Sequence, residues 1–222
     1  MAVLEIGGPM GRLEALLDEP ANGRGVTADG LLETGHPSGV RAAVVFAHPH
    51  TEYGGTMHTK VVYQAAKALS RIGCAVLRFN FRGAGASAGN FSDGPGEMDD
   101  FRAALDFMSE RYPGVKRWTA GMSFGSYIAL TVGAEDPRVS TLIGIALPIS
   151  RYDFEPVARS TKAKFFIQGE RDEICPLKAM REFYARCAEP KELVVIDGAD
   201  HLFDGKVSEV ADAIEDLLGD WS

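Results

Sequence analysis

The residues with the plainest chemical potential in this 222-residue chain form a G-x-S-x-G pentapeptide, Gly121-Met122-Ser123-Phe124-Gly125. An apolar run at 117–120 precedes it, and an apolar helical stretch at 126–134 follows it. In a strand-turn-helix of this kind the serine hydroxyl stands above the sheet edge, and the helix N-terminus stabilises a developing negative charge. The pentapeptide by itself also fits an ordinary glycine-serine turn, because the chain holds 25 glycines. The flanking strand and helix favour a nucleophilic Ser123.

A nucleophilic serine needs a base that takes its proton and an acid that orients the base. In this arrangement the acid follows the serine along the chain, and the histidine follows the acid. His201 is the one histidine of five that comes after Ser123, and it lies just past an apolar run. Glu170 and Asp172 follow the preceding apolar run. We prefer Asp172, because Gly169 makes the turn and three residues carry the carboxylate over the sheet edge; the sequence predicts a triad of these three side chains.

An oxyanion formed during acyl transfer needs two backbone N–H donors. One comes from the residue after the serine, which is Phe124, and the other from the loop after an earlier strand. That loop contains Pro49, which has no N–H to donate. The sequence therefore leaves His50 or Thr51 as the second donor.

The elements that must position these residues alternate between short apolar runs and helical patterns, which is typical of an α/β fold with a mostly parallel sheet. The expected strands are 42–46, 75–79, 117–120, 140–145, 164–167 and 193–196. Besides the helix after the pentapeptide, helical patterns cover 62–72, 98–108 and 207–218. The segments 3–6 and 12–17 predict an N-terminal antiparallel hairpin, and 22–40 predicts a surface loop. We expect one domain over residues 1–222.

The composition excludes several classes of partner. The 31 acidic and 23 basic side chains give a net charge of −8, which disfavours nucleic acid and anionic membranes. No apolar run approaches the roughly 18 residues of a membrane span. The first residues carry no secretory pattern, and Cys74, Cys175 and Cys187 form no C-x-x-C pair, so we expect a cytoplasmic protein with free thiols. No feature of the sequence predicts an oligomeric state.

With these residues in place, the chain resembles the α/β-hydrolase superfamily over essentially its whole length, and more closely its small bacterial members without a cap domain. The matching stretches are His48-Pro49-His50, Gly54-Gly55-Thr56-Met57-His58-Thr59-Lys60, Arg78-Phe79-Asn80-Phe81-Arg82 with Gly85, Ser87 and Gly89, Gly121–Gly125, Gly169–Asp172 and His201-Leu202-Phe203. Thr51 and Leu202 depart from the family pattern without touching a triad position. The resemblance implies a serine hydrolase of carboxylic esters or related acyl compounds, acting on a small-molecule acyl substrate without a metal or an organic cofactor.

Members of this superfamily commonly carry a cap after the strand that follows the serine helix. Here the span 149–163 is only 15 residues, too short for a cap of several helices. We therefore expect an open cleft. The residues expected to line it are Tyr53, Phe91, Met122, Phe124, Tyr152 and Phe154.

Other functions fit parts of the sequence. The stretch 83–88 matches a dinucleotide fingerprint, but more loop follows it where the fingerprint needs a helix. His48, His50 and His58 form no recognisable zinc set, because no Cys or carboxylate pair lies near them. Cys175 lies outside any nucleophile turn and is interpreted as a packing residue. A thioesterase or peptidase with the same triad, and a non-catalytic ligand-binding protein of this fold, remain the alternatives.

Overall fold

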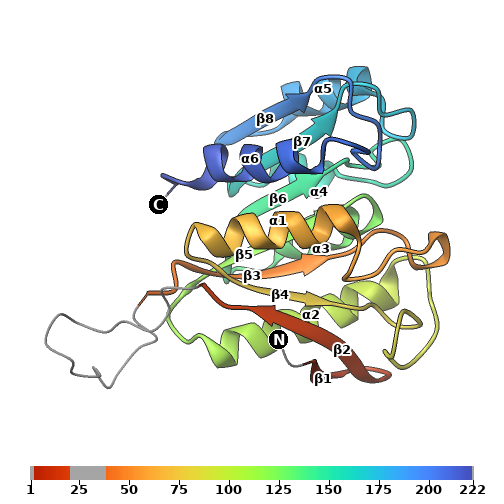
Figure 1. Cartoon of the computed structure of the whole chain (residues 1–222), viewed down its shortest axis with the longest axis vertical. Helices are drawn as coiled ribbons and strands as arrows, with labels where there is room; N and C mark the ends of the chain where they lie inside the picture. Colours follow the sequence, from red (N-terminus) through yellow and green to blue (C-terminus); the bar gives the residue numbers. More distant parts are fainter. Residues whose placement is uncertain (1–2, 21–38, 222) are drawn as a thin grey trace, which may run out of the picture.

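The computed structural model of the chain describes residues 3–20 and 39–221, and the predicted loop at 22–40 lies almost wholly outside them. Eight strands form one sheet in the order β1-β2-β4-β3-β5-β6-β7-β8 (Figure 1). The strands are β1 (Leu4–Gly8), β2 (Gly11–Asp18), β3 (Ala42–Ala47), β4 (Ala75–Phe79), β5 (Lys116–Met122), β6 (Val139–Ile145), β7 (Ala163–Gly169) and β8 (Lys191–Ile196). The helices are η1 (Thr51–Tyr53), α1 (Lys60–Arg71), α2 (Pro95–Arg111), α3 (Phe124–Glu135), α4 (Glu155–Arg159), α5 (Leu177–Arg186) and α6 (Val207–Leu218).

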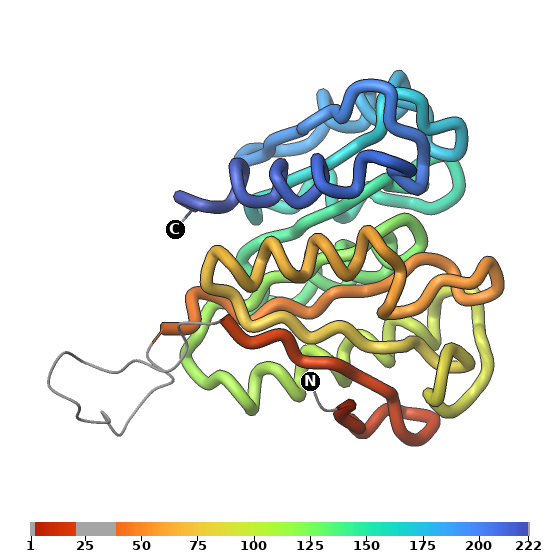
Figure 2. The backbone as a smooth tube through the Cα atoms, viewed as in Figure 1, coloured from red at the N-terminus to blue at the C-terminus, as the bar shows by residue number. Residues whose placement is uncertain are grey.

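The sheet has the mixed direction that the sequence predicts. β1 and β2 form the antiparallel hairpin, and β2 also runs antiparallel to β4. All pairs from β4 to β8 are parallel. The trace in Figure 2 shows the hairpin (red) at one end of the sheet and β7 (teal) and β8 (blue) at the other. The prediction of an α/β-hydrolase fold is confirmed.

Two apolar layers hold the helices on the two faces of the sheet. Successive side chains of a strand point to opposite faces, so Ala43 and Val45 of β3 enter one layer, and Val44 and Phe46 enter the other. The first layer contains residues of α2, α3, α4 and α5, and the second contains residues of α1 and α6. Because both faces of the central strands are covered, their sequences are mainly apolar and show no regular alternation of polar and apolar residues.

The short helices α4 and α5 were not predicted. α4 spans only five residues, too few for a helical period to show. α5 buries only Met180 and Phe183 completely, so its apolar stripe is too narrow to stand out in the sequence. α4 is the one helix between β6 and β7, which confirms that no cap domain is inserted there.

The register of the sheet decides which loops meet at its carboxyl edge. Ala47 of β3 lies opposite Gly121 of β5, which places the loop after β3 beside the serine turn. Gly169 of β7 lies opposite Ile196 of β8, which places the loops carrying Asp172 and His201 side by side. The three candidate groups therefore converge although up to 78 residues separate them along the chain.

Candidate active site

Ser123 occupies the turn between β5 and α3 with a backbone that few residues other than glycine adopt, at φ 52° and ψ −124°. Its N–H donates to the carbonyl oxygen of Ile145 at 2.9 Å. A side chain at Gly121 would collide with the backbone of Gly125, and one at Gly125 would collide with the carbonyls of Ala47 and His48. The two glycines therefore let helix, strand and neighbouring loop approach closely enough to hold the strained serine.

A continuous chain of hydrogen bonds joins the three candidate catalytic side chains. His201 Nε2 lies 2.9 Å from Ser123 Oγ. His201 Nδ1 lies 2.8 Å from Asp172 Oδ2. The imidazole thus touches a nucleophile with one nitrogen and a carboxylate with the other, which is the arrangement that general-base activation of a serine requires.

Asp172 is buried and held by protein donors. Its Oδ1 accepts hydrogen bonds from the backbone N–H groups of Ile174 at 2.9 Å and Cys175 at 2.7 Å. Its Oδ2 accepts from the side-chain amide of Gln168 at 2.9 Å. These bonds offset the cost of burying the charge and fix the carboxylate toward the imidazole. The alternative acid, Glu170, instead accepts a hydrogen bond from the N–H of Gly198 at 2.8 Å and organises the neighbouring loop.

The backbone N–H groups of His50, Thr51 and Phe124 donate to no acceptor among the described residues. Phe124 is the first residue of α3, whose first N–H groups have no partner within the helix and form the positive end of its dipole. His50 and Phe124 line the cleft that contains Ser123, whereas Thr51 does not belong to its lining.

His48 fixes the loop after β3 from inside the protein. Its Nδ1 donates to the carbonyl oxygen of Pro49 at 2.6 Å, and its Nε2 accepts from the N–H of Phe81 at 3.0 Å. Acceptance at Nε2 needs a neutral imidazole, and complete burial lowers the pKa of His48 from 6.5 to about 4. His48 is therefore a structural residue that ties the loop after β3 to the loop after β4.

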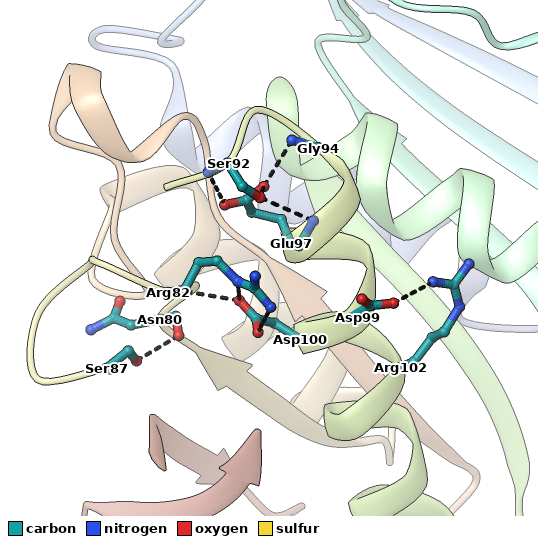
Figure 3. A network of polar contacts seen from close by, with 10 residues as sticks. Asn80, Arg82, Ser87, Ser92, Gly94, Glu97, Asp99, Asp100 and Arg102 are labelled. Atoms are coloured by element: carbon teal, nitrogen blue, oxygen red, sulfur yellow. Dashed lines mark hydrogen bonds and ion pairs between the residues drawn. The ribbon is translucent and has the colours of Figure 1, made fainter. Parts of the chain in front are cut away.

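The loop after β4 is held by the polar network of Figure 3. Arg82 binds the buried carboxylate of Asp100 through its backbone N–H and through two guanidinium nitrogens, at 2.8–3.0 Å. Glu97, also buried, accepts from the N–H and hydroxyl of Ser92 and from the N–H of Gly94. The network presents Phe91, from the same loop, to the ring of His50 at a centroid distance of 4.3 Å.

The cleft above Ser123 has a volume of about 460 Å³ and opens to solvent. Its lining is mostly apolar and comprises Pro49, His50, Tyr53, Ser123, Phe124, Pro148, Arg151, Tyr152, Ile174, His201 and Leu202. Three of these, Tyr53, Ile174 and Leu202, are large apolar side chains exposed by 53–79%. Of the predicted lining residues, the structure places Tyr53, Phe124 and Tyr152 in the cleft.

Three predicted lining residues lie elsewhere. Met122 is fully buried in the layer under α1 and α6, because it follows the alternation of β5 toward the other face. Phe154 is buried against Tyr127 and Phe183. Phe91 does not line the cleft and packs instead against the rings of His50 and Phe124.

Five residues that line the cleft or contact the triad were not predicted from the sequence: Pro148, Arg151, Ile174, Leu202 and Gln168. Arg151 and Pro148 lie on the irregular segment after β6, where no periodicity marks their direction. Ile174 follows two residues after Asp172, and Leu202 directly follows His201, so adjacency to the triad was the available signal. Gln168 is the second-last residue of β7 and follows buried apolar residues, and a buried amide there needs a polar partner.

Asp172, Cys175 and His201 each have an atom that could bind a metal ion, and these atoms lie within 4.8 Å of one another. This is the one such group among the described residues. The carboxylate oxygens of Asp172 already accept from Gln168, His201 and two backbone N–H groups. Burial raises the pKa of the Cys175 thiol, so it stays protonated. The group is thus the acid-base pair with a packed thiol beside it, as expected of Cys175 from the sequence.

The chain is similar to known proteins over most of its length. The family model described as serine aminopeptidase, S33, matches residues 38–161. The chain therefore belongs to this family of α/β hydrolases. An uncharacterised protein of Rickettsia prowazekii is 37% identical over 180 residues, which cover 77% of this chain and 76% of that protein.

Two solved structures resemble the whole chain. An α/β serine hydrolase homologue from Coxiella burnetii is 33% identical with a TM-score of 0.85, and the match covers 98% of this chain and 97% of the other. A member of the α/β serine hydrolases without a lid, XC6422 from Xanthomonas campestris, is 34% identical with a TM-score of 0.85, over 99% and 94% of the two chains. Across residues 3–20 and 39–221, no helix combines the length and apolar character that crossing a membrane requires.

Proposed function

We propose that this chain hydrolyses carboxylic esters of small molecules through an acyl-enzyme on Ser123. The observation that carries the proposal is the unbroken chain of hydrogen bonds from Ser123 through His201 to Asp172. Ser123 and His201 line an open cleft, where a substrate can reach them. The three buried free thiols are in keeping with a reducing cytoplasm.

The first half-reaction forms the acyl-enzyme. His201 Nε2 takes the proton of the Ser123 hydroxyl as its oxygen attacks the ester carbonyl carbon. Asp172 stabilises the imidazolium that results. The N–H groups of Phe124 and of His50 or Thr51 hold the oxyanion, and the place of His50 in the cleft favours His50. The tetrahedral intermediate then expels the alcohol oxygen, which receives the proton from His201.

The second half-reaction regenerates the serine. His201 takes a proton from water, whose oxygen attacks the acyl carbon. The Ser123 oxygen leaves and recovers its proton from His201, and the carboxylic acid departs. Each step uses groups that the fold already holds in place, so little rearrangement is required.

A peptidase or thioesterase would use the same triad, and the family description names an aminopeptidase. An aminopeptidase must bind the free ammonium group of its substrate, for which a carboxylate is the natural partner. No described residue that lines the cleft is acidic, and Arg151 brings a positive charge instead. This observation favours esters over peptides with a free N-terminus.

The test is a panel of acyl esters, thioesters and aminoacyl amides with the wild-type chain and the Ser123→Ala variant. We expect Ser123-dependent turnover of short esters at a higher kcat/KM than of amides. Turnover of aminoacyl amides alone would replace the esterase proposal with a peptidase. A wild-type chain that turns over no compound and resists serine-directed phosphonates would establish the non-catalytic alternative.

A further inference from the structure

Arg151 is the arginine that lines the cleft above Ser123. It lies on the segment between β6 and α4 and lines the same cleft as Ser123 and His201. Some arginines elsewhere, such as Arg82 and Arg138, bind carboxylates at 2.6–3.0 Å, and others form no ion pair among the described residues. Arg151 forms no ion pair with any described residue. Its guanidinium instead lies over the ring of Tyr152, 5.5 Å from the ring centroid.

The acidic residues around Arg151 are engaged elsewhere or exposed. Asp93 accepts a hydrogen bond from the Tyr152 hydroxyl at 3.2 Å. Glu52 is exposed on η1. Among the described residues of the lining, Arg151 therefore carries the one permanent charge, and it is positive in a protein of net charge −8.

His50 offers a second polar group in the same cleft. Its side chain is packed between the rings of Tyr53, Phe91 and Phe124, and the residue is only 7% exposed. Its buried Nδ1 has no hydrogen-bond partner among the described residues. Burial, helped by the charge of Arg151, lowers the pKa of His50, so the ring is neutral near neutral pH and keeps one N–H to donate.

We propose that the preferred substrate is an ester bearing a carboxylate, which Arg151 binds at the mouth of the cleft while His50 donates a hydrogen bond to it. This inference rests on the esterase activity proposed above and names the substrate class. The guanidinium lies over the ring of Tyr152, 5.5 Å from its centroid, and a planar guanidinium can bind a carboxylate through two N–H groups at once. The apolar side chains of Ile174 and Leu202 accept the carbon skeleton between the carboxylate and the scissile bond.

The test compares esters that differ only in charge. 4-Methylumbelliferyl hydrogen glutarate and 4-methylumbelliferyl valerate share a leaving group, and the first adds a carboxylate to the acyl chain. 3-Carboxyphenyl valerate and phenyl valerate place the carboxylate on the alcohol side. We expect one of the two anionic esters to exceed its neutral partner in kcat/KM by about tenfold or more, since a charge-assisted pair contributes on that order.

Substitutions test which residues produce the preference for the anionic ester. Arg151→Gln is expected to abolish the preference mainly through a higher KM, because Arg151 does not touch the reacting atoms, and Arg151→Glu is expected to reverse it. His50→Gln is expected to reduce it less. The matched control is Arg181→Gln, an exposed arginine of α5 outside the cleft, which should leave the preference unchanged. The preference should also fall as salt is added.

A binding measurement separates the two proposals. The Ser123→Ala chain should bind the anionic ester more tightly than the neutral one, and Arg151→Gln in that background should remove the difference. Hydrolysis of neutral esters by Ser123 with no anionic preference in turnover or binding would overturn the carboxylate site and leave the esterase intact. Arg151-dependent binding without turnover would overturn the esterase and leave the anion site. Neither result would overturn both.

Discussion

The floor of the cleft and its rim are built in opposite ways. On the floor, Ser123 and Asp172 are held by backbone hydrogen bonds, and His201 is hydrogen-bonded to both of their side chains. On the rim, Tyr53, Ile174 and Leu202 are exposed, and Arg151 forms no ion pair with a described residue. In the proposed reaction, the groups that do the chemistry are held in place by the sheet edge. The proposed substrate contacts come from side chains that can change at little cost to the fold.

The largest effect on activity is expected for Asp172→Asn, on the floor of the cleft. An amide in place of the carboxylate leaves the imidazolium without its counter-charge and allows the wrong tautomer, so kcat should fall by about 10³–10⁴. The measurement is ester turnover, with circular dichroism to show that the fold persists. Glu170→Gln is the matched control and should change kcat less than about threefold. Equal losses in the two variants would contradict the assignment of the acid.

The second effect concerns the backbone beneath the serine. Gly125→Ala forces a methyl group against the carbonyls of Ala47 and His48, so the free energy of unfolding should fall by about 3 kcal/mol. Urea unfolding measures it. Gly7→Ala, where a methyl group meets no atom within 4 Å, should cost less than about 1 kcal/mol. A Gly125→Ala chain as stable as wild type would show that the close approach is not required.

A third effect appears as a pH dependence of stability. His48 is protonated near pH 6.5 when unfolded but only near pH 4 when folded, so protonation favours the unfolded chain between these values. The contribution of His48 to the free energy of unfolding is complete above pH 6.5 and is lost as the pH falls to 4. The total loss is roughly 3 kcal/mol.

The check is the free energy of unfolding from pH 4 to 7 in wild type and His48→Gln. The wild-type curve should fall more steeply with acid than that of the variant. His58→Gln, at an exposed histidine, serves as the control and should keep the wild-type slope. Parallel curves for all three proteins would contradict the buried neutral imidazole.

The smallest effects belong to the rim. Leu202→Ala and Ile174→Ala should change the free energy of unfolding by less than about 0.5 kcal/mol, because both side chains are already exposed. Their KM for long-chain esters should rise a few-fold, while kcat for acetate esters should not change. Chain-length profiles measure this. A loss of kcat for all esters would show that rim and floor are not separable.

The sequence predicted the floor better than the rim. Ser123, Asp172 and His201 each follow an apolar strand directly, and parallel strands bring their carboxyl ends to one edge, so spacing along the chain is enough to bring the three together. Whether a residue lines the cleft depends on the direction of its side chain. Strand alternation turns Met122 toward the opposite face of the sheet, and Phe154 packs against Phe183 in the core. Contacts such as Arg82 with Asp100, or Gln168 with Asp172, arise from the packed fold and leave no periodic signal.

The central claim is that Ser123 is the nucleophile activated by His201. Intact-mass spectrometry after treatment with a fluorophosphonate tests it most directly, with the modified peptide then sequenced. We expect one adduct per chain, located on Ser123, absent in Ser123→Ala and formed at least 10³-fold more slowly in His201→Gln. No adduct in the wild-type chain, or an adduct that persists in Ser123→Ala, would contradict it.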